Sequence, residues 1–179
     1  MQNTPASNPL RFSTLAGMIL AAALMRIVPH PPNFSPIAAI ALFGGAQFAD
    51  KRAAFAVPLA AMFLSDLVLG LHTLTPVVYG CFALVVCLGL WLRRQRSAGR
   101  IGVAALVGSV LFFAITNFAV WAGTNMYPRT AAGLAGCYTA AIPFFGNTLA
   151  GDFTFTAVLF GGLAQAEWRL PRLREICPA

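Results

Sequence analysis

A thiol, an imidazole and two carboxylates stand out in this otherwise apolar chain as groups that could do chemistry. Cys81 follows Thr75 and Pro76, a typical helix start, and a helix N-terminus favours the thiolate form of cysteine. A thiolate is a soft ligand for a transition metal, and the imidazole of His30 is a second candidate ligand for the same ion. The alternative for Cys81 is the common one for membrane cysteines, a small apolar filler.

The carboxylates of Asp66 and Asp152 lie in the middle of apolar stretches. A charged side chain in hydrocarbon costs about 2.5–3.5 kcal/mol, so each is expected to face a partner or a water-filled cavity. One interpretation is that they line a binding cavity. The other is that they hold helices together, by pairing with Arg26 or with a serine or asparagine.

The remaining polar residues gather near one side of the expected membrane, although they come from distant parts of the sequence. This distribution predicts a cavity that opens to the outside. The candidate ligand-binding residues, with Cys81 as the reactive one, are His30, Asn33, Asp66, Tyr79, Cys81, Asn117, Trp121, Tyr127, Asn147 and Asp152. Tyr79 and Tyr127 also suit the membrane interface as aromatic anchors.

The elements that position these residues are expected to be transmembrane helices. The chain is 59% hydrophobic and 9% charged, with a mean hydropathy of +0.76, which indicates a polytopic membrane protein of the all-α class. We expect one integral membrane domain over residues 1–179, a bundle of six spans, of which the second is short for a crossing. The spans run over about 13–28, 37–49, 53–71, 76–92, 101–121 and 147–168. Between the last two, Pro143 and Gly146 predict a re-entrant or surface segment.

Charge gives the expected orientation. With six spans and both termini inside, the outer segments carry only Arg26 and Arg129 of the 12 basic residues. The other ten fall in cytoplasmic segments: Arg11, Lys51, Arg52, Arg93, Arg94, Arg96, Arg100, Arg169, Arg172 and Arg174. This asymmetry follows the positive-inside rule. The net charge of +7 is therefore a topology signal, and nucleic-acid binding is excluded.

Several motifs resemble those of a known family. The stretch RIVPHPPNFSPIAA from Arg26, followed by ALFGGA from Ala41, is similar to the start of the solitary vitamin B12 (cobalamin) S-components, the BtuM type of energy-coupling-factor (ECF) transporters. The resemblance continues through SD at Ser65, VYGC at Val78, TNFAVW at Thr116 and GD at Gly151, and spans nearly the whole chain.

The resemblance implies a six-helix protein of the bacterial inner (cytoplasmic) membrane that binds cobalamin from the outer side and takes it up. The cysteine that ligates cobalt would be Cys81, with His30, Asp66 and Tyr79 in support. A thiolate on one face of cobalt weakens the bond on the opposite face. We therefore expect a base-off complex and loss of cyanide from cyanocobalamin, in a step that need not be enzymatic.

The same resemblance implies a partner. Gly17 and Ala21 form a small-xxx-small pair, similar to the motif through which S-components meet the ECF transmembrane subunit, although that motif is usually built from alanines. Plain internal packing of the first span explains the pair equally well. No GxxxxGK[ST] motif occurs, so we expect no nucleotide cofactor, and energy would come from an outside ATPase module or from trapping of the ligand inside.

Three other functions are compatible with the residues. One is an S-component for thiamin or riboflavin, in which Cys81 is filler and a ring stacks on Trp121, Tyr127 and Phe144. A second is a membrane enzyme that uses the imidazole, carboxylate and thiol of His30, Asp66 and Cys81. The third is a structural subunit without a ligand. Colour separates the first of these from a cobalamin protein, because a corrinoid complex is pink to red.

Overall fold

The computed structural model describes residues 8–174, and these residues form six α-helices, one short 3-10 helix and no strand. The prediction of an all-α fold is confirmed. The helices are α1 Pro9–Leu24, α2 Ile37–Gln47, α3 Lys51–Leu69, α4 Thr75–Leu92, α5 Ala98–Gly123, α6 Ala131–Arg169 and η1 Pro171–Leu173.

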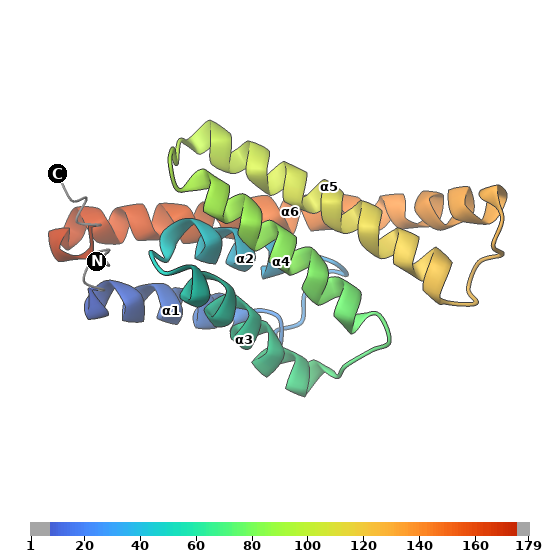
Figure 1. Ribbon diagram of the computed structural model, residues 1–179, viewed down its shortest axis with the longest axis horizontal. Coiled ribbons are helices and arrows are strands. Elements are labelled where there is room, and N and C mark those ends of the chain that lie inside the picture. The colour runs from blue at the N-terminus through green and yellow to red at the C-terminus, as the bar shows by residue number, and fades with distance from the viewer. Residues whose placement is uncertain (1–7, 175–179) are drawn as a thin grey trace, which may run out of the picture.

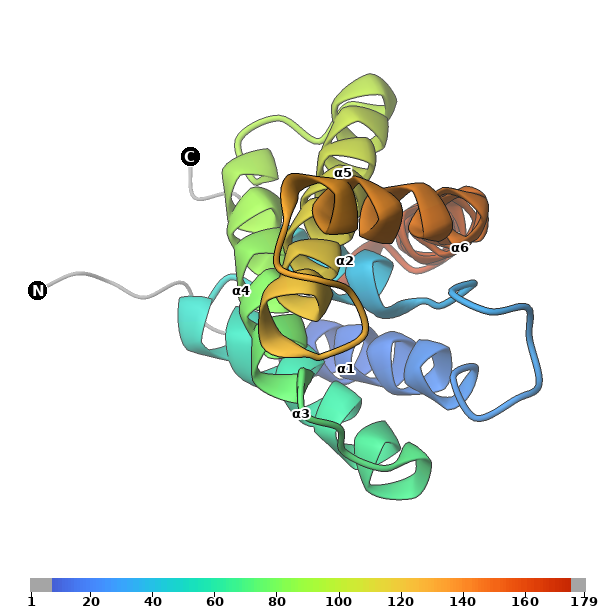
Figure 2. The ribbon, with the colours of Figure 1, turned by 90° about the vertical axis from the view of Figure 1, so that its right-hand side faces the viewer.

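Successive helices run back and forth between two ends of the molecule (Figure 1). The α2–α3 and α4–α5 loops lie at the end where α1 begins and α6 finishes. We call this the basic end, because the ten basic residues assigned above to inner segments lie there along the chain. The α1–α2, α3–α4 and α5–α6 loops lie at the opposite or far end, which Figure 2 views directly, with the α5–α6 hairpin nearest to the viewer.

Polar side chains mark where the helices begin. The side chains of Asn8, Asp50, Ser97 and Thr130 each accept a hydrogen bond from a backbone N–H in the first turn of α1, α3, α5 and α6, respectively. The first-turn N–H groups of a helix have no carbonyl partner within it, so these caps stabilise each start. In α4, Pro76 occupies the first turn, where no donor is needed.

Four helices, α3, α4, α5 and α6, are long and apolar enough to cross a membrane, whereas α1 and α2 are shorter apolar helices. Many large apolar side chains on the outer surface are exposed, as in a protein surrounded by lipid. The chain is accordingly a membrane-embedded, multi-pass helical protein.

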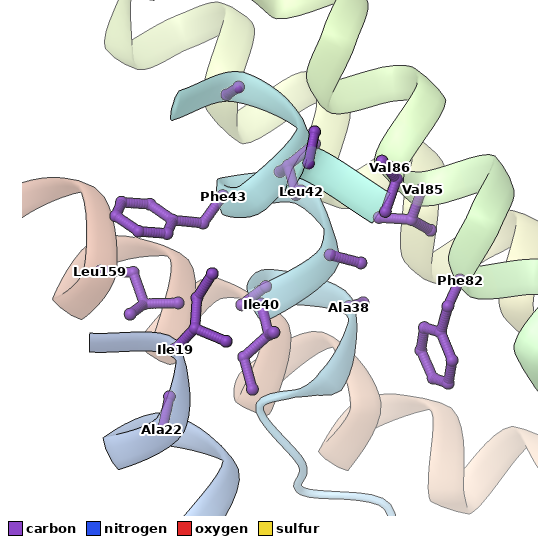
Figure 3. Packing of buried hydrophobic residues seen from close by; sticks show 14 of the residues in the cluster. Ile19, Ala22, Ala38, Ile40, Leu42, Phe43, Phe82, Val85, Val86 and Leu159 are labelled. Carbon is purple, nitrogen blue, oxygen red and sulfur yellow. The ribbon is translucent and has the colours of Figure 1, made fainter. Parts of the chain in front are cut away.

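Helix α2 forms the centre of the bundle. Ten of its 11 residues are buried, and Figure 3 shows its side chains between α1, α4 and α6. It crosses α4 where two glycines meet: a Cβ on Gly45 would lie 2.3 Å from the Val86 carbonyl oxygen and 2.9 Å from the Gly89 Cα. The absence of both side chains allows this close backbone approach. The short length of α2 suits a core helix.

The structure corrects the boundaries predicted for the spans. The first helix is Pro9–Leu24 rather than 13–28, because Asn8 caps it early, and the last is Ala131–Arg169 rather than 147–168. The segment before residue 147, predicted as re-entrant or surface, is thus the first part of one continuous helix. Pro143 removes a donor without ending the helix, because contacts on both sides of it hold this part of α6 against α5. The other four predicted spans agree with helices to within three residues at each end.

Candidate functional site

A cavity of about 380 Å³ opens at the far end, lined by α4, α5, α6 and the loops that join the helices there. This volume lies within the range that ligand-binding pockets usually have. Its wall is apolar and aromatic, with a few amide, hydroxyl, thiol and imidazole groups. The lining residues are Asn33, His72, Leu74, Val77, Val78, Phe112, Phe113, Thr116, Asn117, Val120, Met126, Tyr127, Cys137, Ala140, Ala141, Phe144 and Thr148.

One face of α5 supplies much of the wall. Phe112, Phe113, Thr116, Asn117 and Val120 recur at the spacing of a helix face, and all five line the cavity. The Asn117 amide donates to the Phe113 carbonyl at 2.8 Å, and the Thr116 hydroxyl donates to the Phe112 carbonyl at 2.7 Å. This repeat was visible in the sequence, but only Asn117 was predicted as a site residue.

The first turns of α6 form the opposite wall, fixed to α5 by side-chain contacts. The Tyr138 hydroxyl donates to the Ala114 carbonyl at 2.5 Å, and the Cys137 thiol lies 3.4 Å from the Asn117 carbonyl oxygen. The Phe113 ring packs against Phe145 with centroids 4.6 Å apart. The sequence could not show that Cys137 lines a cavity, because its part of α6 was expected outside the bundle.

The proline-rich α1–α2 loop closes one side of the cavity. The Asn147 amide donates to the Pro32 carbonyl at 3.0 Å, and Gly151 allows this loop to lie against α6, since a Cβ there would be 2.9 Å from the Ser35 nitrogen. Asn33 adopts a positive φ of 64°, which asparagine tolerates better than most residues. The PHPPNFSP stretch therefore positions Asn33 on the cavity wall.

Cys81 lies below the cavity rather than on its wall. The residue is 2% exposed and is not among the lining residues. Val77 and Val78, which do line the cavity, precede it by four and three positions in α4, so Cys81 is on the same helix face, about one turn deeper. Residues 8–174 contain no group of three or more His, Cys, Asp or Glu side chains that could hold a metal.

Asp66 is held in an internal polar cluster between α3, α4 and the turn that follows α1. Its carboxylate pairs with the Arg26 guanidinium at 2.8 Å and accepts a hydrogen bond from the Tyr79 hydroxyl, also at 2.8 Å. Arg26 further donates to the Ser65 hydroxyl and, at 3.2 Å, to the Met62 carbonyl. The Arg26 and Asp66 side chains are only 12% and 11% exposed. This arrangement matches the second interpretation of Asp66, a charge that holds helices together.

We expect Tyr79→Phe to destabilise the protein by about 1.5–3 kcal/mol, the usual contribution of a hydrogen bond to a charged group. The ring remains, and only the bond from α4 to Asp66 is lost. Thermal unfolding in detergent measures the change. Tyr127→Phe is the matched control, since the Tyr127 hydroxyl has no hydrogen-bond partner among residues 8–174. Equal effects of the two substitutions would contradict a role for the Tyr79 hydroxyl in the cluster.

Asp152 is also paired within the bundle. It is 3% exposed and is hydrogen-bonded to the Ser109 hydroxyl, which lies 3.0 Å from the Ala105 carbonyl oxygen. The pair connects α6 to α5 and does not line the cavity. Here too the geometry agrees with the interpretation in which a serine partner holds two helices together.

The other predicted residues fall into separate places at the far end. His30 is exposed, and its Nδ1 lies 2.9 Å from the Pro31 carbonyl oxygen. The Trp121 indole donates to the Pro128 carbonyl at 3.0 Å and thereby braces the α5–α6 loop. Of the predicted binding residues, the structure brings together on the cavity wall Asn33, Asn117 and Tyr127. Those that it places elsewhere are His30, Asp66, Tyr79, Cys81, Trp121, Asn147 and Asp152.

Comparison with known proteins gives a family but no relative of known activity. Residues 6–173 match DUF6580, a family of unknown function. No curated protein and no solved structure matches the chain. Because the match covers nearly the whole sequence, from before α1 to η1, the chain belongs to the DUF6580 family of unknown function.

Proposed function

We propose that this protein binds vitamin B12 (cobalamin or a related corrinoid) from the outer side of a bacterial cytoplasmic membrane and takes it up. The observation that carries the proposal is the position of Cys81, one helical turn below the α4 wall of an open cavity and on the same helix face. A soft thiolate in that position suits a metal that arrives already chelated, as cobalt does in a corrin ring.

In the proposed topology, α1 to α6 alternate in direction across the membrane and both termini are inside. Helix α2 is too short to span the membrane alone and crosses as the buried core helix together with its flanking loops. Ten of the 12 basic residues lie at the basic end, so the positive-inside rule assigns that end to the cytoplasm and the cavity to the outer side. Gly17 and Ala21 are exposed on α1, so the face proposed for an ECF energising module is accessible.

The chemistry at Cys81 would be ligand exchange without oxidation or reduction. The bond between cobalt and the nucleotide base breaks, a bond between cobalt and sulfur forms, and the thiol proton passes to water. Electron donation by sulfur weakens the bond on the opposite face. Cyanide can then leave that face as hydrogen cyanide, with water taking its place on cobalt. His30 is exposed in the α1–α2 loop at the same end and is the second candidate ligand.

A corrinoid is larger than the cavity, so part of it would remain at the membrane surface. Contact between cobalt and sulfur also requires a movement that exposes Cys81, which is 2% exposed in this structure. Next to it in α4, Phe82 stacks on the cavity residue Phe112 with centroids 5.7 Å apart, and Val77 and Val78 form the wall above.

The test is a visible absorption spectrum of the purified protein after incubation with cyanocobalamin. We expect the wild type to change the corrin bands and release cyanide, and Cys81→Ala and Cys81→Ser to do neither. Cys87→Ala is the matched control, because Cys87 lies on the same helix but is exposed on the outer surface. Size-exclusion chromatography checks that each variant is folded. Unchanged spectra and cyanide release in folded Cys81→Ala would refute the proposal.

One observation favours a second candidate, an S-component for a smaller vitamin such as thiamin or riboflavin. Two of the three rings predicted to stack on such a ligand, Tyr127 and Phe144, line the cavity, whereas Trp121 does not. Titration of the purified protein with thiamin, riboflavin and cobalamin separates the two candidates. Tight binding of a vitamin other than cobalamin, unaffected by Cys81→Ala, would support this alternative.

A further inference from the structure

Four aromatic rings line the cavity. The rim of a corrin carries amide groups, and contact with amides does not call for so many rings. Phe112, Phe113, Tyr127 and Phe144 surround a space of about 380 Å³. Aromatic walls of this kind stack on planar heterocycles, and each stacked base contributes roughly 1–3 kcal/mol by alanine substitution. Cobalamin carries one such planar group, the benzimidazole of its nucleotide, which leaves cobalt when a thiolate takes its place.

We propose that the aromatic α5–α6 side of the cavity, with Phe113, Tyr127 and Phe144, is the binding subsite for this displaced benzimidazole base. The inference rests on the proposed function and deepens it, because it states which part of the ligand the cavity recognises. The consequence is selectivity: a complete corrinoid with an aromatic base binds more tightly than cobinamide, which has the same ring and metal but no base.

The position of the cavity suits a tethered base. Val77 and Val78 form its α4 wall, and Cys81 follows on the same face about one helical turn deeper. A base released from cobalt above Cys81 stays attached to the corrin by its nucleotide linker, so it can only reach nearby space. The corrin ring over Cys81 would lie toward the α4 wall of the cavity, so the aromatic α5–α6 side is the space left for the base.

One hydroxyl on the wall is available for the freed base. The nitrogen that leaves cobalt keeps its lone pair, because the thiol proton passes to water, and it therefore needs a donor. Two of the three hydroxyl groups on the wall already donate to carbonyls, Thr116 to Phe112 at 2.7 Å and Thr148 to Phe144 at 3.3 Å. The third, that of Tyr127, has no partner among residues 8–174. Besides Tyr127, the Asn33 amide and the His72 imidazole are donors on the wall without a side-chain partner among residues 8–174. We assign Tyr127 as the donor to the base nitrogen, because its hydroxyl is carried by one of the rings that would stack on the base.

The test measures the affinities of cobalamin and cobinamide for the detergent-purified full chain. We expect the wild type to bind cobalamin more tightly. Tyr127→Phe should weaken cobalamin binding about fivefold, and Phe144→Ala about tenfold, while both leave cobinamide binding unchanged. The matched control is Phe118→Ala, because Phe118 is 51% exposed on α5 and does not line the cavity. It should leave both affinities as in the wild type.

The outcomes separate this inference from the proposed function. If Cys81 is needed for the spectral change but the wild type binds the two corrinoids equally, the base subsite is wrong and cobalamin binding stands. Equal losses of both ligands in Tyr127→Phe and Phe144→Ala would also overturn the subsite, because Tyr127 and Phe144 would then contact the corrin itself. If neither corrinoid shows a Cys81-dependent spectrum, the proposed function fails and the subsite fails with it.

Discussion

Gly89→Ala is expected to destabilise the protein by about 3 kcal/mol, at the upper end of the usual range for overpacked cores. A Cβ at this position would lie 2.4 Å from the Leu42 carbonyl oxygen, 2.8 Å from the Gly45 Cα and 2.9 Å from the Ala46 nitrogen. All three atoms are backbone of α2, which cannot move aside as a side chain can. Because α2 is the core of the bundle, we expect loss of the folded protein on size-exclusion chromatography and a large fall in its unfolding temperature.

The control for this prediction lies on the same helix. A Cβ on Gly80 would meet nothing within 4 Å, so Gly80→Ala should be neutral or stabilising by up to about 1 kcal/mol through helix propensity. The same chemical change is thus expected to have opposite signs at two positions of α4. If Gly89→Ala were as stable as Gly80→Ala, the close crossing of α2 and α4 would be wrong.

Arg26→Met is the second substitution with a large expected effect, a loss of about 3–5 kcal/mol, the usual result of removing one partner of a buried ion pair. It leaves the Asp66 carboxylate, 8% exposed, with the Tyr79 hydroxyl as its partner in place of a cation. Methionine keeps much of the side-chain length of arginine, so the loss reports charge more than packing. Chemical or thermal unfolding in detergent gives the magnitude.

A second substitution checks the cause. Adding Asp66→Asn to Arg26→Met removes the unpaired charge while an amide oxygen can still accept from Tyr79, so we expect most of the lost stability to return. This rescue is a coupling between neighbours, which distant sites do not show. If the two losses of stability simply added in the double variant, loss of the Arg26–Asp66 ion pair would not be the cause.

The basic end contains a second buried charge, that of Arg11. Arg11 is 7% exposed, pairs with Glu167 of α6, and donates to the Leu173 carbonyl and, at 3.0 Å, to Gln47 of α2. Arg96 reaches the same Gln47 oxygen at 2.5 Å. In the sequence, Arg11 and Arg96 indicated only the orientation of the chain in the membrane. In the structure, their contacts also connect α1, α2, α6 and η1 at this end.

Much of the fold could be predicted from the sequence, because hydropathy and charge act locally. Apolar runs must form helices to satisfy their backbone groups in lipid, and basic residues accumulate on one side, so the all-α class and the alternation of ends follow directly. The start of α4 at Thr75 could likewise be predicted, since Pro76 supplies a local signal. The start of α6 could not, because Pro143 ends a helix in isolation but not in one packed against α5.

The sequence by itself determined which polar residues lie toward the far end, except for Asp152, which lies near the middle of α6. The tertiary structure alone decided which of these residues share a space. Asp66 and Asp152 resemble cavity residues in the sequence, yet each has a partner on a neighbouring helix, Arg26 and Ser109. Asn117 and Cys137 meet across the cavity although 20 positions separate them. The physical reason is that depth in a membrane follows from distance along a helix, whereas a contact between helices depends on how each one is rotated and packed, which local sequence does not specify.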